Sequence, residues 1–451
     1  MSDRLSTLAA RLGSDLQGED ADVSRIVTDT RELAPGDLLV ALEGERFDAH
    51  DFLAEARAKG AVGAVVSRRV DEPLAQIVVP DTRLALGLLA RSHRLAWQGR
   101  LVAVTGNSGK TTVKEMLASM LSQRASTLAT RGNLNNDIGA PLTLLALTAS
   151  HRYAAVELGA NHLGEIAWTT ALARPDVAII TNVTGAHVGE FGGLGQIAQA
   201  KGEILAGLAE SGYAILDRDE RYYAVWRALA GRARVLDFAL EAPASVRADD
   251  LVCDRAGRYA FTLSLPGSPT VRVALPLMGR HNVRNALAAA AAAHAMGLEP
   301  AEIVTGLEAC VPVRGRMQPV AGLRGSCLID DTYNANPGAM RAAIESLTSL
   351  PGPHWCLLGP MGELGRDSAA LHAEVGRVAR ALDVDCLATC GAEARPAAEA
   401  FGEQGHHFED RAALERFVRD QLPPRASVLV KGSRSARMEQ LVDALRDDAP
   451  R

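Results

Sequence analysis

Short apolar runs alternate with helix-like segments through the middle of this 451-residue chain. Four runs lie at residues 101–105, 153–156, 177–180 and 213–216, and apolar residues at helical spacing mark 111–121 and 285–296. Alternation of this kind is typical of a mostly parallel sheet with helices on both faces. We therefore predict a central α/β domain over residues 84–310.

The first 83 residues follow the same logic on a smaller scale. Apolar runs occupy 38–42, 63–66 and 76–80, a helical stretch covers 51–59, and the turn signal Ala34-Pro-Gly-Asp37 precedes the first run. This region contains no cluster of catalytic side chains, so we predict a small α/β recognition domain over residues 1–83.

Residues 311–451 repeat the alternation again. Apolar runs at 327–329, 355–358, 384–388 and 427–430 separate helical patterns that begin near residues 338, 368, 395, 411 and 435. Asn336-Pro337 fits a helix N-cap followed by proline at the first helical position. The region is predicted to be a Rossmann-like domain, without the GxGxxG signature of dinucleotide binding. The expected fold is thus α/β with three domains.

Composition and charge narrow the classes of partner. The net charge is −6 and the pI is near 6.0, which argues against a polyanion-binding surface and hence against nucleic acid. No apolar run approaches the roughly 20 residues that span a membrane, and the N-terminus has no signal core. The six cysteines show neither CxxC nor zinc spacing, so we expect buried free thiols. A cytoplasmic monomer without membrane insertion is predicted.

A glycine-rich loop joins the run at 101–105 to the helix pattern at 111–121. Its residues are Thr105, Gly106, Asn107, Ser108, Gly109, Lys110, Thr111 and Thr112. Between a strand and a helix, backbone N–H groups of such a loop hold phosphate oxygens. Lys110 would reach the terminal phosphates of ATP, and the Thr111 hydroxyl would ligate Mg²⁺. The usual pattern has glycine at position 104, where valine stands, so the loop is the compact form TGxxGKT.

Lysine is scarce in this arginine-rich chain and occurs only at positions 59, 110, 114, 201 and 431. Where arginine carries most of the surface charge, a lysine indicates chemistry that arginine cannot perform. Lys110, Lys201 and Lys431 stand beside glycines at predicted element ends, which points to such chemistry there; for the loop that begins at Lys431, a structural turn is the alternative. Lys59 and Lys114 are interpreted as lysines without a special role.

Two further polar residues end neighbouring strands of the central sheet. Glu157 ends the run at 153–156, and His187 follows the run at 177–180. In open parallel sheets ligands bind beyond the carboxyl ends of the strands, so both should lie near Thr111. Mg²⁺ favours carboxylates with phosphate oxygens, which suits Glu157. His187 is a less usual ligand, and a hydrogen-bonding role is the alternative.

These motifs, in this order, resemble those of the Mur ligases of peptidoglycan synthesis, and the resemblance covers nearly the whole chain. The matching segments are the loop at 105–112, Gly279-Arg-His-Asn-Val-Arg-Asn-Ala286, Arg314-Gly-Arg316 and Asp330-Asp-Thr-Tyr-Asn-Ala-Asn-Pro337. They look like the family's ATP loop, adenine-contacting segment, hinge and C-terminal ATP-contacting segment.

One stretch resembles a particular branch of this family. Gly132-Asn-Leu-Asn-Asn-Asp-Ile-Gly-Ala-Pro-Leu-Thr143 is similar to the GNxNNxxGxPLT stretch of the members that add D-alanyl-D-alanine. The neighbouring tripeptide-forming members usually have a Thr-Thr-Pro stretch there. The resemblance thus implies UDP-N-acetylmuramoyl-tripeptide and D-alanyl-D-alanine as substrates, with ATP and Mg²⁺ as cofactors.

The resemblance also implies residue roles. Lys110, Glu157, His187 and Lys201 are expected to act in catalysis, and Lys201 matches a lysine that some Mur ligases carbamylate. Thr111, Glu157 and His187 are the expected metal ligands. The expected nucleotide contacts outside the loop are Asn282, Arg316 and Asp331. The expected contacts to the UDP-linked substrate are Thr30, Arg31, Asn135, Asn136 and Asn161.

Three other functions were weighed. A sibling ligase that adds diaminopimelate or lysine, or a folylpolyglutamate synthase, would perform the same chemistry with another amine, and the stretch at 132–143 argues against it. A regulatory P-loop protein would bind nucleotide without ligating. A small-molecule kinase would release a stable phosphorylated product. No feature of the sequence indicates whether the third residue of the tripeptide is diaminopimelate or lysine.

Overall fold

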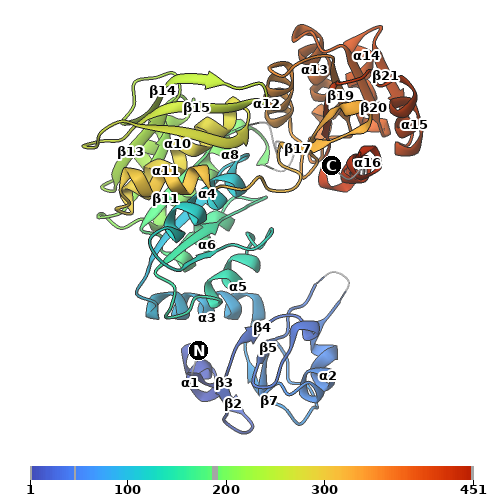
Figure 1. Cartoon of the computed structure of the whole chain (residues 1–451). Coiled ribbons are helices and arrows are strands. Elements are labelled where there is room, and N and C mark those ends of the chain that lie inside the picture. Colours follow the sequence, from blue (N-terminus) through green and yellow to red (C-terminus); the bar gives the residue numbers. More distant parts are fainter. Residues whose placement is uncertain (1–2, 45–46, 185–190, 448–451) are drawn as a thin grey trace.

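The structure is a computed structural model that describes residues 3–44, 47–184 and 191–447. Among the described residues, three large β-sheets, each with its own helices, follow one another along the chain, and a two-stranded sheet lies beside the first. Figure 1 shows the blue N-terminal part at the bottom, the green and yellow central part above it on the left, and the red C-terminal part at the upper right. The α/β class predicted from the sequence is confirmed.

The N-terminal sheet is small and mainly parallel. Its strand order is β2-β7-β6-β5-β4, and only β2 runs antiparallel to its neighbour. The strands are Leu16–Gln17 (β2), Ile26–Val27 (β4), Leu38–Val40 (β5), Gly63–Val66 (β6) and Ala75–Val78 (β7). A separate antiparallel pair consists of Asp3–Arg4 (β1) and Asp22–Val23 (β3). The helices before residue 80 are Leu5–Arg11 (α1), Thr30–Glu32 (η1), Ala49–Phe52 (η2) and Leu53–Ala58 (α2).

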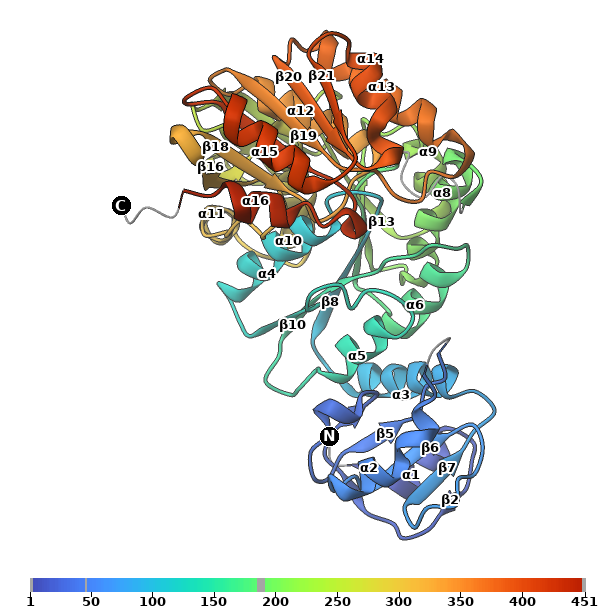
Figure 2. The same ribbon diagram turned by 90° about the vertical axis from the view of Figure 1, so that its right-hand side faces the viewer.

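Helix α3 (Thr82–Ala96) joins this sheet to the next one (Figure 2). Asp81 caps it by accepting the N–H groups of Arg83 and Leu84. Leu86 and Leu89 complete the N-terminal core, while Ala90 belongs to the core of the central sheet. The boundary predicted between residues 83 and 84 therefore falls within the first turn of a helix that serves both units.

The central sheet has nine strands in the order β16-β15-β14-β13-β12-β11-β8-β10-β9. The strands are Arg100–Thr105 (β8), Thr127–Ala129 (β9), Tyr153–Glu157 (β10), Val177–Ile180 (β11), Tyr213–Asp217 (β12), Arg234–Ala239 (β13), Val246–Cys253 (β14), Arg258–Ser264 (β15) and Val271–Met278 (β16). Strands β9 to β14 pair in parallel, and β14, β15 and β16 extend the sheet as antiparallel hairpins. The apolar runs predicted as strands are present; the antiparallel extension was not predicted.

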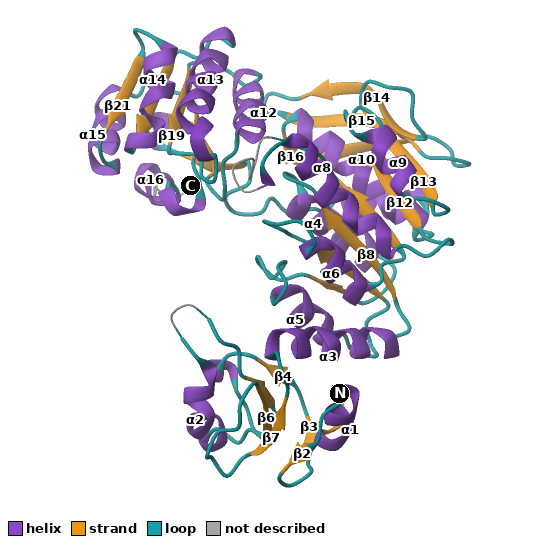
Figure 3. Ribbon diagram, turned by 180° about the vertical axis from the view of Figure 1, so that it is seen from behind, coloured by secondary structure: helices purple, strands orange, loops and turns teal. Residues whose placement is uncertain are grey.

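Helices cover both faces of the central sheet, as Figure 3 shows. Val102 and Val104 of β8 pack under α4 and α10, whereas Leu101 and Ala103 point into the opposite core. This alternation follows from the two-residue period of a strand, and it explains why the run is apolar throughout. The helices are Lys110–Ser122 (α4), Gly139–Leu145 (α5), Glu165–Ala173 (α6), Leu194–Gly202 (α8), Glu203–Gly207 (η3), Tyr223–Leu229 (α9), Arg280–Ala295 (α10) and Pro300–Glu308 (α11).

The C-terminal sheet has six strands in the order β17-β18-β22-β19-β20-β21, all parallel except β17. The strands are Gln318–Ala321 (β17), Cys327–Asp331 (β18), His354–Leu358 (β19), Cys386–Cys390 (β20), Gly405–Phe408 (β21) and Ser427–Lys431 (β22). The helices are Leu323–Gly325 (η4), Pro337–Thr348 (α12), Gly365–Asp367 (η5), Ser368–Ala381 (α13), Ala392–Ala394 (η6), Arg395–Phe401 (α14), Arg411–Gln421 (α15), Arg434–Ala436 (η7) and Glu439–Leu445 (α16). The predicted N-cap is confirmed, since Asn336 accepts the N–H of Ala339.

The structure corrects two smaller predictions and adds one observation about Lys114. The helix expected from residue 285 begins at Arg280, because Gly279 adopts a φ of +89° and the segment after it turns directly into α10. Cys253 is exposed on the antiparallel extension, although the other five thiols are wholly or partly buried. Lys114, interpreted as unimportant, is almost completely buried. None of the described helices has both the length and the apolar character needed to cross a membrane.

Candidate active site

The carboxyl ends of three central strands meet where the chain reverses its direction across the sheet. Strand β8 lies between β10 and β11, so the connections that leave it run to opposite sides. Such a switch point leaves a crevice in which open α/β sheets bind ligands. Here the crevice opens into a cavity of about 730 Å³, whose walls come from both the central and the C-terminal sheets.

The glycine-rich loop forms one wall of this cavity. Gly106 and Gly109 adopt φ values of +140° and +81°, and a side chain on Gly106 would come within 2.0 Å of the Thr181 hydroxyl. Ser108 is held by Asn182, whose side-chain oxygen accepts the Ser108 N–H at 2.9 Å. Helix α4 begins immediately afterwards at Lys110, as predicted. The loop therefore has the tight, backbone-lined form in which N–H groups bind phosphate.

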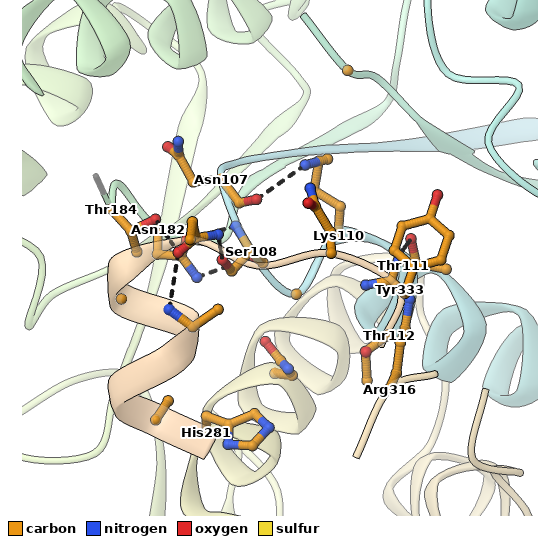
Figure 4. Close-up of a pocket in the computed structure, with 18 of the residues that line it drawn as sticks. Asn107, Ser108, Lys110, Thr111, Thr112, Asn182, Thr184, His281, Arg316 and Tyr333 are labelled. Carbon is orange, nitrogen blue, oxygen red and sulfur yellow. Dashed lines mark hydrogen bonds between the residues drawn. The ribbon is translucent and has the colours of Figure 1, made fainter. Parts of the chain in front are cut away.

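Lys110 lies at the mouth of the loop (Figure 4). Its Nζ donates to the carbonyl oxygens of Gly106 at 2.8 Å and Asn107 at 3.3 Å. Desolvation in the cavity wall lowers the pKa of the ammonium; Glu157 opposes this shift, and the positive charge of Arg316 adds to it. A cation held among carbonyl dipoles beside another cation is well placed to bind an anion.

Glu157 and Thr111 form a buried oxygen pair beside Lys110. The Thr111 hydroxyl donates to Glu157 Oε2 at 2.8 Å, and Asn135 Nδ2 donates to Oε1 at 2.7 Å. Arg316 Nη2 in turn donates to Thr111 Oγ at 2.7 Å, from a position 205 residues further along the chain. The predicted metal pair and one predicted nucleotide contact are thus in direct contact with each other.

The C-terminal sheet closes the opposite wall. Lys431, at the end of β22, donates from Nζ to Asp331 Oδ2 at 2.5 Å and to the Asn334 carbonyl at 2.8 Å. Arg316 stacks on Tyr333, with 4.1 Å between the guanidinium carbon and the ring centre. Asn336 Nδ2 donates to Ser108 Oγ at 3.2 Å, so the start of α12 contacts the glycine-rich loop directly.

Two further groups complete the cavity lining. Asn282 and Asn285 lie in the first turns of α10, where Asn282 donates to the Met278 carbonyl and accepts from Asn285. Lys201 is buried on α8, and its Nζ lies 5.4 Å from the ring centre of Phe191. Burial and the neighbouring charge of Lys110 lower the pKa of Lys201 to about 7.

The structure brings most of the predicted site residues together. Residues of that set that line the cavity are Asn107, Ser108, Gly109, Lys110, Thr111, Thr112, Asn135, Asn136, Glu157, Asn161, Lys201, Asn282, Arg316 and Asp331. Thr105 and Gly106 belong to the loop but are not among the residues that line the cavity. Thr30 and Arg31 lie on η1 of the N-terminal sheet, outside this cavity, and Arg31 forms an ion pair with Asp29. His187 lies outside the described residues.

Several cavity residues were not predicted from the sequence as site residues. They include Asn182, Thr184, His281, Tyr333 and Asn336. Tyr333 and Asn336 belong to the segment 330–337, which resembles a nucleotide-contacting segment. They could therefore have been predicted as site residues together with Asp331. Asn182 follows β11 just as Glu157 ends β10, and the rule that ligands bind beyond strand ends would have found it.

The fold and the cavity together define a P-loop nucleotide-binding enzyme whose active site is shared by two α/β units. Models of two families match: the Mur ligase middle domain over residues 104–293, and the Mur ligase, glutamate ligase domain over residues 315–434. The chain belongs to the Mur ligase family.

Individual relatives agree with this assignment. The chain is 45% identical over 446 residues to UDP-N-acetylmuramoyl-tripeptide--D-alanyl-D-alanine ligase of Escherichia coli (strain K12), covering 98% of each chain. Its structure is similar to that of MurF from Acinetobacter baumannii, with a TM-score of 0.93, 39% identity and 98% of each chain covered. It is also similar to MurF ligase from Thermotoga maritima in complex with ADP, with a TM-score of 0.83, 28% identity, and 94% and 97% of the two chains covered.

Proposed function

We propose that this chain joins D-alanyl-D-alanine to UDP-N-acetylmuramoyl-tripeptide in an ATP-dependent reaction, the step for which its Escherichia coli relative is named. The observation that carries the proposal is the single cavity in which Lys110, Thr111 and Glu157 from the central sheet face Arg316, Asp331 and Lys431 from the C-terminal one. A cytoplasmic location and a monomeric state stay predictions from the sequence.

Thr111 and Glu157 fit a site for Mg²⁺. Their oxygens lie 2.8 Å apart, and oxygens on adjacent corners of a magnesium octahedron lie about 2.9 Å apart. Both are hard oxygen ligands, and the remaining positions around the ion would be left for phosphate oxygens and water. Mg²⁺ bound there would neutralise charge on the phosphates during transfer.

The chemistry has two steps. A terminal carboxylate oxygen of the tripeptide attacks the γ-phosphorus of ATP, ADP leaves, and an acyl phosphate forms. The amine nitrogen of D-alanyl-D-alanine attacks the acyl carbon, loses its proton, and the tetrahedral intermediate expels inorganic phosphate. Activation is necessary because a carboxylate is a poor electrophile. Lys110 and Arg316 would stabilise the charge of the transferring phosphoryl group.

The cavity offers neutral contacts for the UDP-linked substrate near this centre. Asn135, Asn136 and Asn161 line the cavity on the side of Glu157. Asn136 and Asn161 also organise their own segments, since Asn136 Oδ1 accepts the Gly139 N–H and the Asn161 N–H donates to Glu165. The side-chain amides of Asn135 and Asn136, which are held in place by their hydrogen bonds to Glu157 and Gly139, can bind peptide or sugar groups with little loss of conformational entropy.

The function is tested by phosphate release from ATP. We expect release only when the UDP-tripeptide and D-alanyl-D-alanine are supplied together, with an amide product of matching mass. Tripeptides that end in diaminopimelate and in lysine, assayed in parallel, identify the accepted third residue. Phosphate release that does not depend on D-alanyl-D-alanine would indicate a regulatory ATPase. A stable phosphorylated product would indicate a kinase.

Lys201 is predicted to act close to the metal site, as a neutral amine or as its carbamate. An amine must be neutral to react with CO₂, in a reaction that forms an N–C bond and releases a proton. Because the pKa of Lys201 is lowered to about 7, the neutral form predominates above that pH and is lost below it. With ¹³C-labelled bicarbonate, we expect a carbamate carbon signal that grows as pH rises from 6 to 8.

The matched variant is Lys201→Arg, which keeps a cation but cannot be carbamylated. We expect it to lose about 10²-fold in kcat and to lack the labelled signal, in line with removal of one preorganised charged group. Full activity of Lys201→Arg would refute a role for Lys201 near the metal.

A further inference from the structure

Lys114 is one of the least exposed side chains of the protein, although nothing in its sequence context marks it. It lies one turn after Thr111 on α4, and only 1% of its surface is exposed. Its Nζ donates to the Thr130 carbonyl at 2.8 Å and forms an ion pair with Glu115, whose side chain is 39% exposed. The ammonium thus binds one fixed backbone oxygen in the interior and one carboxylate at the surface.

Thr130 connects this lysine to the proposed metal ligand. Thr130 follows β9 and is itself buried, and its hydroxyl oxygen accepts the backbone N–H of Glu157 at 3.0 Å. Its own N–H donates to the Ala155 carbonyl of β10. Thr130 therefore fixes the last residue of β10 from the side, and Lys114 fixes Thr130.

The same threonine begins the segment that holds the Glu157 carboxylate. Five residues later, Asn135 donates to Glu157 Oε1 at 2.7 Å, and its carbonyl accepts the Gly159 N–H at 2.8 Å. Both the backbone and the side chain of Glu157 are therefore positioned by the segment 130–135, whose first residue binds Lys114.

We propose that Lys114 is a positioning residue for the metal ligand Glu157, acting through the Thr130 carbonyl and hydroxyl. The inference rests on the proposed function only in taking Glu157 as a ligand of Mg²⁺. Groups that orient metal ligands contribute measurably to metal affinity even though they do not touch the ion. Lysine suits the role because its flexible stem reaches from α4 to the start of the 130–135 segment and ends in a compact multiple donor.

The experiment measures metal binding directly. Mn²⁺ replaces Mg²⁺ as a probe, and loss of the free Mn²⁺ resonance gives its dissociation constant on the full-length protein with a non-hydrolysable ATP analogue. Lys114→Met keeps the length of the side chain but removes the donor. We expect it to raise the Mn²⁺ dissociation constant about tenfold. The matched control, Glu115→Gln, removes the ion pair but leaves the bond to Thr130, and should change the constant less than twofold.

Variants of Thr130 test the path. Thr130→Val removes the oxygen that accepts the Glu157 N–H, and should weaken Mn²⁺ binding about as much as Lys114→Met; Thr130→Ser keeps that oxygen and should restore binding. In the double variant Lys114→Met/Thr130→Val the effects should be less than additive, since both act on one contact chain. Thr130→Val also reports on the path if Lys114→Met does not fold.

Two results would overturn the inference: unchanged Mn²⁺ affinity in folded Lys114→Met protein, or fully additive effects in the double variant. A merely structural lysine would lower the melting temperature without moving the Mn²⁺ constant. The proposed function is tested separately by D-alanyl-D-alanine-dependent phosphate release in the unmodified protein. Its failure would leave the Mn²⁺ comparison valid.

Discussion

Lys110→Met is expected to lower kcat by about 10³-fold. This is the size of loss expected when an enzyme loses one preorganised donor that stabilises a charged transition state. Methionine matches the lysine stem in length but cannot carry charge. Lys110 contacts the loop carbonyls at 2.8 and 3.3 Å, so its ammonium lies where a terminal phosphate would meet the N-terminus of α4. Steady-state phosphate release with both substrates present measures the effect.

The thermal stability of Lys110→Met should not fall with its activity. The pKa of Lys110 is lowered in the folded protein, so its charged form is disfavoured by folding at pH values below the ordinary lysine pKa. Removing the group should leave the melting temperature unchanged or raise it, which separates loss of catalysis from loss of fold. Arg232→Met, at an exposed arginine paired with Glu210, is the matched control and should stay within twofold of the unmodified enzyme. Activity of Lys110→Met within tenfold of the unmodified enzyme would contradict the role.

Glu157→Gln is expected to cost about 10²-fold in kcat at ordinary Mg²⁺ concentrations, because a bound metal ion supplies several kcal/mol of charge stabilisation. Glutamine keeps the shape of the side chain and can still accept from Thr111, but it is a weaker ligand for a divalent cation. Raising Mg²⁺ should therefore recover part of the lost activity. A Mg²⁺ titration of phosphate release measures both the loss and the recovery.

Glu210→Gln serves as the control for charge removal, since the Glu210 side chain is 72% exposed and forms an ion pair with the exposed Arg232. Thr111→Ser keeps the second hydroxyl and should stay close to full activity, whereas Thr111→Val should resemble Glu157→Gln. A Glu157→Gln enzyme with the same Mg²⁺ dependence as the unmodified protein would show that this carboxylate does not hold the metal.

The glycine-rich loop could be predicted because its information is local. The run at 101–105, the glycines with positive φ and the helix that begins at Lys110 lie within about 20 consecutive residues. The central strands could be predicted for a similar reason. Strands that are buried on both faces, such as β8 and β11, are apolar throughout and stand out as continuous apolar runs. The antiparallel extension was missed, because polar residues interrupt the apolar residues of β14 and β15, and the apolar run of β16 contains Pro276, which argues against a strand.

The family and its substrates were reached from the sequence by resemblance, through the stretch at 132–143 and the segment at 330–337. The side-chain contacts that these segments make could not be predicted in this way. These contacts depend on how the central and C-terminal sheets are placed relative to each other. The spacing of residues along the chain does not specify that placement.

The sequence by itself determined the α/β class, the nucleotide loop and the strand end that carries Glu157, because each depends on local periodicity and backbone conformation. Only the tertiary structure decided that Arg316 binds Thr111, that Asn336 binds Ser108 and that Lys431 binds Asp331. These pairs lie 100 to 228 residues apart, so no local pattern links them. The structure likewise decided that Lys114 is buried behind Glu157, since burial depends on which elements pack over a helix face.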